Sequence, residues 1–222
     1  MKKILAVTAS VLVLGGLFLW PYFVKVKVVC LSQYGDCPAD MSGKLLALNG
    51  KNLASAKRQT NKILKNEFII SEFSTQFKLP STLRVDILVK KPVFALKEAG
   101  SDKFVLVDGD GIVLTDAAST TLPVVEIEGA LPKNGDNTSP SNLFALNLMA
   151  GVNQMYGVTD SKVSGTTLLV ELPGQIRVIF PLDGDSSVLL GSLRLIYSKI
   201  QEEGNPNGFR EIDLRFKNPV LR

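Results

Sequence analysis

Histidine is absent from this chain of 222 residues. Its absence excludes Ser-His-Asp and Cys-His nucleophiles, imidazole zinc sites and acid–base catalysis by histidine. A Ser/Lys pair would not need histidine, but Ser161 and Lys162 are neighbours on an expected strand and would point to opposite faces. The carboxylates of Asp108 and Asp110 fall in a glycine turn. The sequence therefore predicts a protein that is not an enzyme, with no catalytic residue, no cofactor, no metal and no small-molecule substrate.

A strong charge of one sign is also lacking. The chain has 25 lysines and arginines against 21 acidic residues, a net charge of +4, without long blocks of like charge. Nucleic-acid-binding proteins more often carry a dense basic stripe, so nucleic acid is not an expected partner. The hydrophobic content of 45% is too high for a disordered chain, and the length permits one or two compact domains.

One long run is free of charge, from Ile4 to Val24, and it follows Lys2 and Lys3. As a helix this run would be about 31 Å long, close to the hydrocarbon thickness of a bilayer. The lysines would stay inside by the positive-inside rule, and the rings of Trp20, Tyr22 and Phe23 would lie at the outer boundary. We therefore expect a short cytoplasmic tail at 1–3, a single transmembrane helix at 4–24, and an extracytoplasmic remainder attached to the cytoplasmic membrane.

Two alternatives to the anchor remain open, a cleaved signal peptide and a buried helix of a soluble domain. A signal peptide would have a shorter apolar region followed by a site of small residues, whereas Thr8-Ala9-Ser10 lies inside the run. A lipoprotein would need a small residue before its acylated cysteine, and Val29 precedes Cys30.

The chain has only two cysteines, Cys30 and Cys37, with Gly35-Asp36 as turn residues between them. In an oxidising compartment they are expected to form a structural disulfide that closes a small loop, with free thiols as the alternative. A redox or metal role is not favoured, because there is no CxxC motif and no further cysteine.

Residues 25–91 show the order strand, helix, helix, strand, strand. Strands are expected at 25–31, 67–77 and 83–90, and helices from Pro38 to about Leu48 and from Leu53 to Asn66. This order suits a three-stranded sheet covered on one face by two helices.

Residues 92–222 predict a second, strand-rich α+β domain. Asp108-Gly109-Asp110-Gly111 lacks the spacing of an EF-hand loop, so a tight hairpin turn is expected there. Pro173-Gly174 predicts a second hairpin, and the chain closes with an alternating strand over 208–216. Helices are expected at 141–156 and 186–202. The expected fold class is thus α+β, with an N-terminal transmembrane helix, a small β-α-α-β-β domain and a strand-rich α+β domain.

This arrangement resembles the FtsQ/DivIB family of bacterial cell-division proteins, essentially from end to end. The β-α-α-β-β region is similar to the family's membrane-proximal POTRA domain. Short motifs carry the likeness further, namely Lys90-Lys91-Pro92-Val93-Phe94-Ala95, Leu106-Val107-Asp108-Gly109-Asp110-Gly111, Leu122-Pro123-Val124 and Ile212-Asp213-Leu214-Arg215-Phe216. In the first of them, Val89, Lys90 and Lys91 replace the acidic and arginine residues usual in the family.

The resemblance implies a non-catalytic scaffold at the division septum that holds small coiled-coil partners, FtsB and FtsL, and supports septal cell-wall synthesis. The partner-binding positions that it implies here are Arg215, Phe216 and Asn218. If strand 208–216 lies at a sheet edge, a partner strand could pair with its free backbone groups. Two alternatives stay open: Phe216 could fill the core, and the chain could be a POTRA protein of polypeptide transport or outer-membrane assembly.

Overall fold

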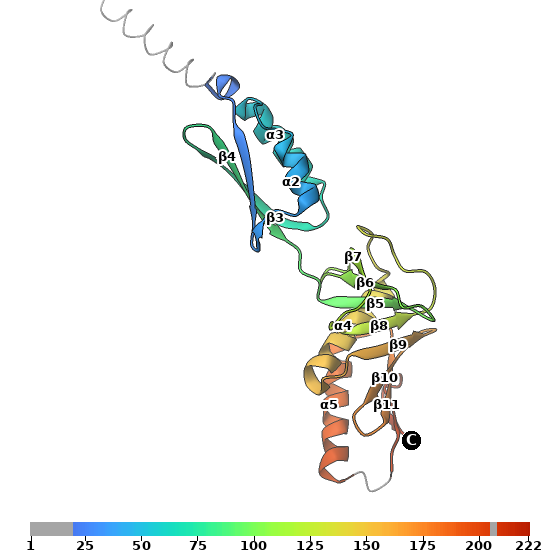
Figure 1. Cartoon of the computed structure of the whole chain (residues 1–222). Coiled ribbons are helices and arrows are strands. Elements are labelled where there is room, and N and C mark those ends of the chain that lie inside the picture. The colour runs from blue at the N-terminus through green and yellow to red at the C-terminus, as the bar shows by residue number, and fades with distance from the viewer. Residues whose placement is uncertain (1–19, 205–207) are drawn as a thin grey trace, which may run out of the picture. The chain divides into compact units, whose positions relative to one another are not determined.

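The computed structural model describes residues 20–204 and 208–222, and the contacts within it divide the chain into two units, Met1–Lys90 and Lys91–Arg222 (Figure 1). Both units are mixed α+β. Within the described residues, no helix is both long and apolar enough to cross a membrane. The expected fold class is corrected accordingly, because the described chain is a pair of α+β units without a transmembrane helix. Of the expected anchor, residues 4–19 lie outside the described residues, and residues 20–23 are helical.

The first unit is built on a four-stranded sheet with the strand order β2-β1-β4-β3. The strands are β1 (Lys27–Ser32), β2 (Gly35–Asp36), β3 (Ile70–Lys78) and β4 (Thr82–Val89). The central pair β1 and β4 is parallel, and the two outer pairings are antiparallel. The expected three-stranded sheet was wrong by one strand, because the two-residue β2 is too short to produce an alternating pattern.

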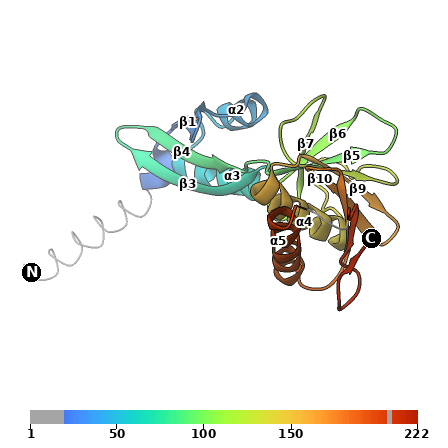
Figure 2. The ribbon, with the colours of Figure 1, turned by 90° about the horizontal axis from the view of Figure 1, so that it is seen from below.

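Helices α2 (Ala39–Leu46) and α3 (Leu53–Lys65) cover one face of this sheet (Figures 1 and 2). Asn52 caps α3, since its side-chain oxygen accepts a hydrogen bond of 2.8 Å from the Ser55 amide. The helices and sheet share a core whose central residues are Val28, Met41, Leu45, Ala56, Leu64, Leu83 and Val85.

Cys30 and Cys37 lie at disulfide-bonding distance, with Cα atoms 5.7 Å apart. They flank the β1–β2 turn, where Leu31 pairs with Asp36 and Ser32 with Gly35. The cross-link therefore joins the short strand β2 to the end of β1.

The second unit contains a nine-stranded sheet with the order β13-β12-β11-β10-β9-β8-β5-β6-β7. Its strands are β5 (Phe94–Glu98), β6 (Phe104–Val107), β7 (Val113–Ala117), β8 (Val124–Ile127), β9 (Asp160–Ser164), β10 (Thr167–Leu172), β11 (Ile176–Pro181), β12 (Glu211–Asp213) and β13 (Val220–Leu221). Helices α4 (Pro140–Tyr156) and α5 (Ser186–Glu202) pack together on the sheet (Figure 1). Their buried core includes Leu96, Val125, Leu146, Met149, Leu168, Val178, Phe180, Leu193 and Ile212.

The expected tight turn at Asp108–Gly111 is present and joins β6 to β7. The Asp108 carboxylate accepts hydrogen bonds from the amides of Asp110, at 3.0 Å, and Ile112, at 2.8 Å. The carboxylate of Asp108 therefore organises the turn, which is a structural role.

The expected closing strand over 208–216 is wrong in length. Only Glu211–Asp213 form a strand, β12, and the chain then turns and returns as β13. The Leu214 amide still binds the Ile179 carbonyl at 2.9 Å, but the Arg215 amide binds the Asp213 side chain. This local bond from side chain to backbone ends the ladder, as aspartate commonly does at turns.

Candidate interaction edge

Strand β13 forms one end of the nine-stranded sheet. It is antiparallel to β12, and Glu211 and Arg222 exchange two backbone hydrogen bonds of 2.9 and 3.0 Å. In an antiparallel ladder the next pair, Ile212 and Leu221, is not hydrogen-bonded, so the backbone groups of Leu221 point away from β12. This edge therefore presents the amide and carbonyl of Leu221 outward.

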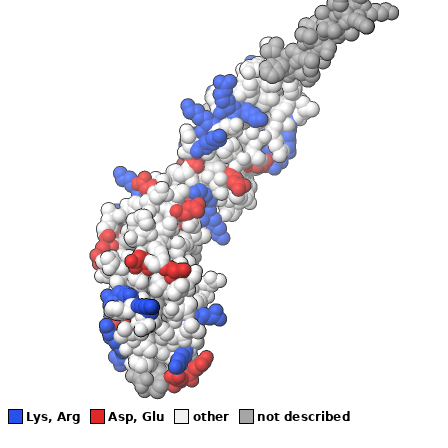
Figure 3. All heavy atoms as spheres, turned by 180° about the vertical axis from the view of Figure 1, so that it is seen from behind, with Lys and Arg blue, Asp and Glu red and all other residues white. Residues whose placement is uncertain are grey.

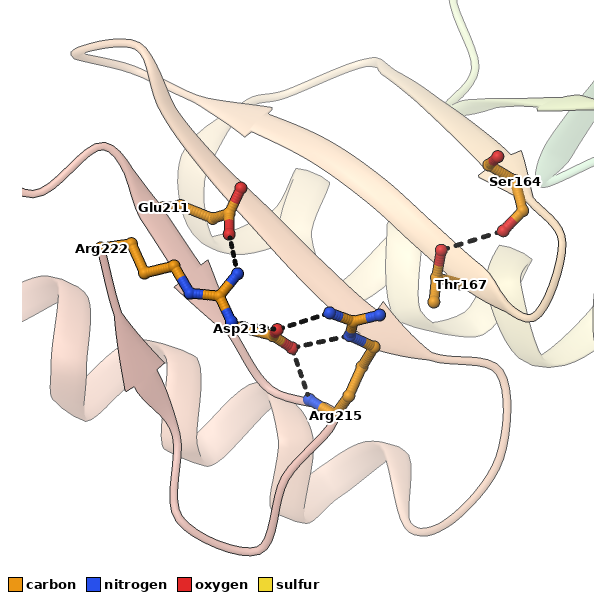
Figure 4. Close-up of polar contacts among 6 residues, drawn as sticks. All are labelled: Ser164, Thr167, Glu211, Asp213, Arg215 and Arg222. Carbon is orange, nitrogen blue, oxygen red and sulfur yellow. Dashed lines mark hydrogen bonds and ion pairs between the residues drawn. The ribbon is translucent and has the colours of Figure 1, made fainter.

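A buried carboxylate supports the edge from within. Asp213 is 0% exposed, and the Arg215 guanidinium donates two hydrogen bonds to it, 2.9 Å from Nε to Oδ1 and 2.6 Å from Nη2 to Oδ2 (Figure 4). These bonds hold the pKa of Asp213 below its ordinary value, with the Arg215 side chain as the largest cause. The fork of two bonds is the geometry that arginine prefers with a carboxylate.

A second arginine joins the two short strands. Arg222 Nη1 lies 3.1 Å from Glu211 Oε1, and its Nη2 lies 3.9 Å from Asp213 Oδ2. The buried carboxylate therefore has a cation on the turn and a second cation at the end of β13.

The three positions implied by the resemblance lie on the turn between β12 and β13. Arg215, Phe216 and Asn218 are all exposed, and Phe216 has 52% of its surface exposed. The Arg215 guanidinium carbon lies 5.8 Å from the centre of that ring. The alternative in which Phe216 fills the core is therefore wrong. The structure places the three residues together beside the edge and does not test their role in binding.

Arg215 is one of the residues that line a surface cavity of about 490 Å³. The cavity is also lined by the end of β11 and by the turn between β9 and β10, in which Thr167 Oγ1 donates a 2.9 Å hydrogen bond to the Ser164 carbonyl (Figure 4). Arg215 therefore lies both on the turn beside the edge strand and in the wall of this cavity.

Sequence reasoning missed Asp213, Glu211 and Arg222, which hold the turn in place, and the whole of β13. An aspartate between Ile212 and Leu214 was the available signal, because a carboxylate in an apolar run needs a cation. No comparable signal marks Val220–Leu221, which is too short to show periodicity.

The other chemically suggestive residues are held in separate structural contacts. Ser161 Oγ donates a 3.1 Å hydrogen bond to the Val124 carbonyl, while Lys162 Nζ lies 3.0 Å from Glu126. Among residues 20–204 and 208–222, no group of three or more acidic or cysteine side chains is placed to hold a metal ion.

Comparison with known proteins adds no family assignment, since no protein-family model matches the chain and no curated protein is significantly similar to it.

Proposed function

We propose that this protein is a non-catalytic scaffold that binds another protein by pairing a strand of that partner with the outer side of β13. The observation that carries the proposal is the outward-facing backbone of Leu221 at the end of the nine-stranded sheet. An added strand would satisfy those groups and gain affinity without a deep pocket.

The side chains beside the edge suit a protein partner. Phe216 offers an exposed ring with Arg215 close to it, and aromatic and arginine side chains are the types that most often dominate binding energy at interfaces. Asn218 adds an exposed amide on the same turn.

The opposite end of the sheet is less suited to strand addition. The loop 135–138 pairs with the beginning of β7, through hydrogen bonds from Val113 to Asp136 of 3.0 Å and from Gly135 to Val113 of 2.8 Å. Because this loop already occupies backbone groups of β7, β13 is the favoured docking edge.

The resemblance to FtsQ/DivIB proteins supports the partner class. We propose small coiled-coil division proteins of the FtsB and FtsL kind as the strand donors, and the division septum as the place of action. The paired cysteines favour an extracytoplasmic location, because disulfides persist in oxidising compartments.

The test compares three variants of the full chain. Leu221→Pro removes the outward donor and obstructs an added strand, so the affinity for a purified FtsB/FtsL-like coiled-coil protein should fall about tenfold or more. Leu221→Ala is the matched control, since it removes the same half-buried side chain but keeps the amide. Val220→Pro removes the inward donor and should detach β13 from β12.

The proposal requires Leu221→Pro to bind more weakly than Leu221→Ala while both remain folded by circular dichroism. Equal affinity of these two variants would rule out strand addition at β13. A fluorescent fusion spread evenly around the cell, with no band at the division site, would rule out the proposed place of action.

A further inference from the structure

One end of the first unit gathers exposed large apolar side chains. Residues 20–27, the α2–α3 connection and the β3–β4 turn meet there, as shown by hydrogen bonds from Val26 to Lys51 of 3.0 Å and from Lys27 to Ser81 of 2.8 Å. Leu79 at the tip of the turn is 78% exposed and Phe23 is 77% exposed. Trp20 and Tyr22 are also exposed, and Trp20 packs edge-on against Phe77 at 5.5 Å. Figures 1 and 2 both show this turn on the side from which the chain enters β1.

The same end carries four exposed lysines, Lys25, Lys27, Lys51 and Lys78. Lys27 and Lys78 both pair with Thr82 across the sheet, so they share the face that α2 and α3 leave open. The Lys51 ammonium donates a 2.6 Å hydrogen bond to Gln59, and within the described residues none of the four forms an ion pair.

Acidic residues are absent from this end of the described unit. Residues 20–90 contain eleven lysines and arginines against five acidic residues, and those five lie on the strands away from the turn, at β2, at the start of α2 or after α3. On the face drawn in Figure 3, this unit shows many more basic than acidic side chains.

We infer that this end of the first unit docks onto a bilayer that contains anionic phospholipid. Tryptophan and tyrosine rings favour the membrane–water boundary, and lysines extend their ammonium groups toward the headgroups while their stems contact apolar surface. Each basic residue near an anionic surface strengthens the association roughly fivefold. An acidic protein would also attract the lysines, but it gives no reason for exposed Leu79 and Phe23 beside them. This inference rests on residues 20–90 and is independent of strand addition at β13.

The chain has a single tryptophan, Trp20, so replacing it allows a tryptophan introduced elsewhere to serve as the only tryptophan probe. In a Trp20→Phe background, the full-length chain carrying Leu79→Trp is reconstituted into vesicles of equal parts phosphatidylglycerol and brominated phosphatidylcholine. The tryptophan at position 79 should be quenched and its emission shifted to the blue. Tyr34→Trp in the same background is the matched control, because Tyr34 is 72% exposed but lies at the other end of β1. Its fluorescence should remain close to that in water.

Charge reversal tests the ionic part. Lys27→Glu with Lys78→Glu should lower the quenching at position 79 strongly, whereas Lys62→Glu with Lys65→Glu, the same change in net charge on exposed α3 positions, should lower it little. Added salt should weaken the quenching as well. Quenching that is equal at positions 79 and 34, or absent at both, would overturn the inference, as would equal effects of the two charge reversals. An acidic protein as the true occupant would leave position 79 unquenched by brominated lipid.

Discussion

The Arg215 guanidinium binds the carboxylate of Asp213 through two hydrogen bonds, although Asp213 is wholly buried and Arg215 lies at the surface. The Arg215 amide binds the same carboxylate at 3.1 Å. One side chain thus fixes both the direction of the turn and the position of a residue proposed for partner binding. Under the proposed function, substitution of Arg215 should affect folding and binding together, so the two effects have to be measured separately.

We expect Arg215→Ala to lower the free energy of unfolding of the second unit, because it removes the main donors to a buried carboxylate. The unfolding free energy of Arg215→Lys should lie between those of the parent and Arg215→Ala. An ammonium group keeps the charge but cannot donate the two parallel hydrogen bonds of the guanidinium. Urea denaturation followed by circular dichroism measures both variants. An Arg215→Ala protein as stable as the parent would show that Arg222 alone compensates the carboxylate.

The lowered pKa of Asp213 predicts a loss of stability in acid. The folded state holds this carboxyl below its ordinary pKa of 3.8, so its contribution is fully present above that value. The contribution disappears as the pH falls from there through the folded-state pKa, because the unfolded chain binds the proton first. Asp213→Asn should therefore show a shallower decline of unfolding free energy than the parent as the pH falls below 3.8. Parallel curves for the two proteins would contradict this assignment.

Phe216→Ala should separate binding from stability. Phe216 is half exposed, so the loss of its side chain should change the unfolding free energy by no more than about 0.5 kcal/mol. If Phe216 is an anchor of the interface, the affinity for the coiled-coil partner should fall about tenfold, which titration calorimetry would detect. Leu195→Ala on α5 removes another exposed apolar side chain, from a residue that is 74% exposed, and should leave the affinity unchanged.

Local patterns predicted the long elements well. The apolar spacing and cap gave a helix from Leu53 to Asn66, and α3 spans Leu53–Lys65. The expected helix 186–202 coincides with α5, Ser186–Glu202. These elements are long enough for their periodicity to exceed chance.

The edge could not be predicted in the same way. Alternation over 208–216 indicated one strand, but the ladder ends where the Asp213 side chain competes for the Arg215 amide. The parallel pairing of β12 with β11 joins residues more than thirty positions apart, and no local pattern specifies such a contact. Arg215, Phe216 and Asn218 on the turn were therefore predicted, but Asp213 and Arg222, which support the turn, were not.

The disulfide should make a modest contribution to the first unit. Its loop spans a sequence separation of 7, so the stabilisation should be less than the ~3 kcal/mol expected of a 15-residue loop. In the double variant Cys30→Ser with Cys37→Ser, hydrogen exchange should accelerate first in β2, which is paired only with the end of β1. Free alkylation of both cysteines in the parent without reductant would show that the pair is not oxidised.

Gly111→Ala should loosen the loop that covers the beginning of β7. Gly111 has a φ of +87°, a conformation in which a side chain costs about 1–3 kcal/mol, and an added Cβ would lie 3.1 Å from Thr138 Cγ2. The Gly111 carbonyl also accepts a 2.8 Å hydrogen bond from the Thr138 amide, so strain at this position acts directly on loop 135–138.

In the Gly111→Ala protein, amide exchange at Val113 and Thr138 should increase more than exchange at the α4 amides. Gly109→Ala, in the same turn without positive φ or close neighbours, is the control and should leave exchange unchanged. Opening this loop frees backbone groups of β7, so light scattering should also show that the Gly111→Ala protein self-associates more readily than the parent. Unchanged amide exchange at Val113 would mean that the loop does not depend on Gly111.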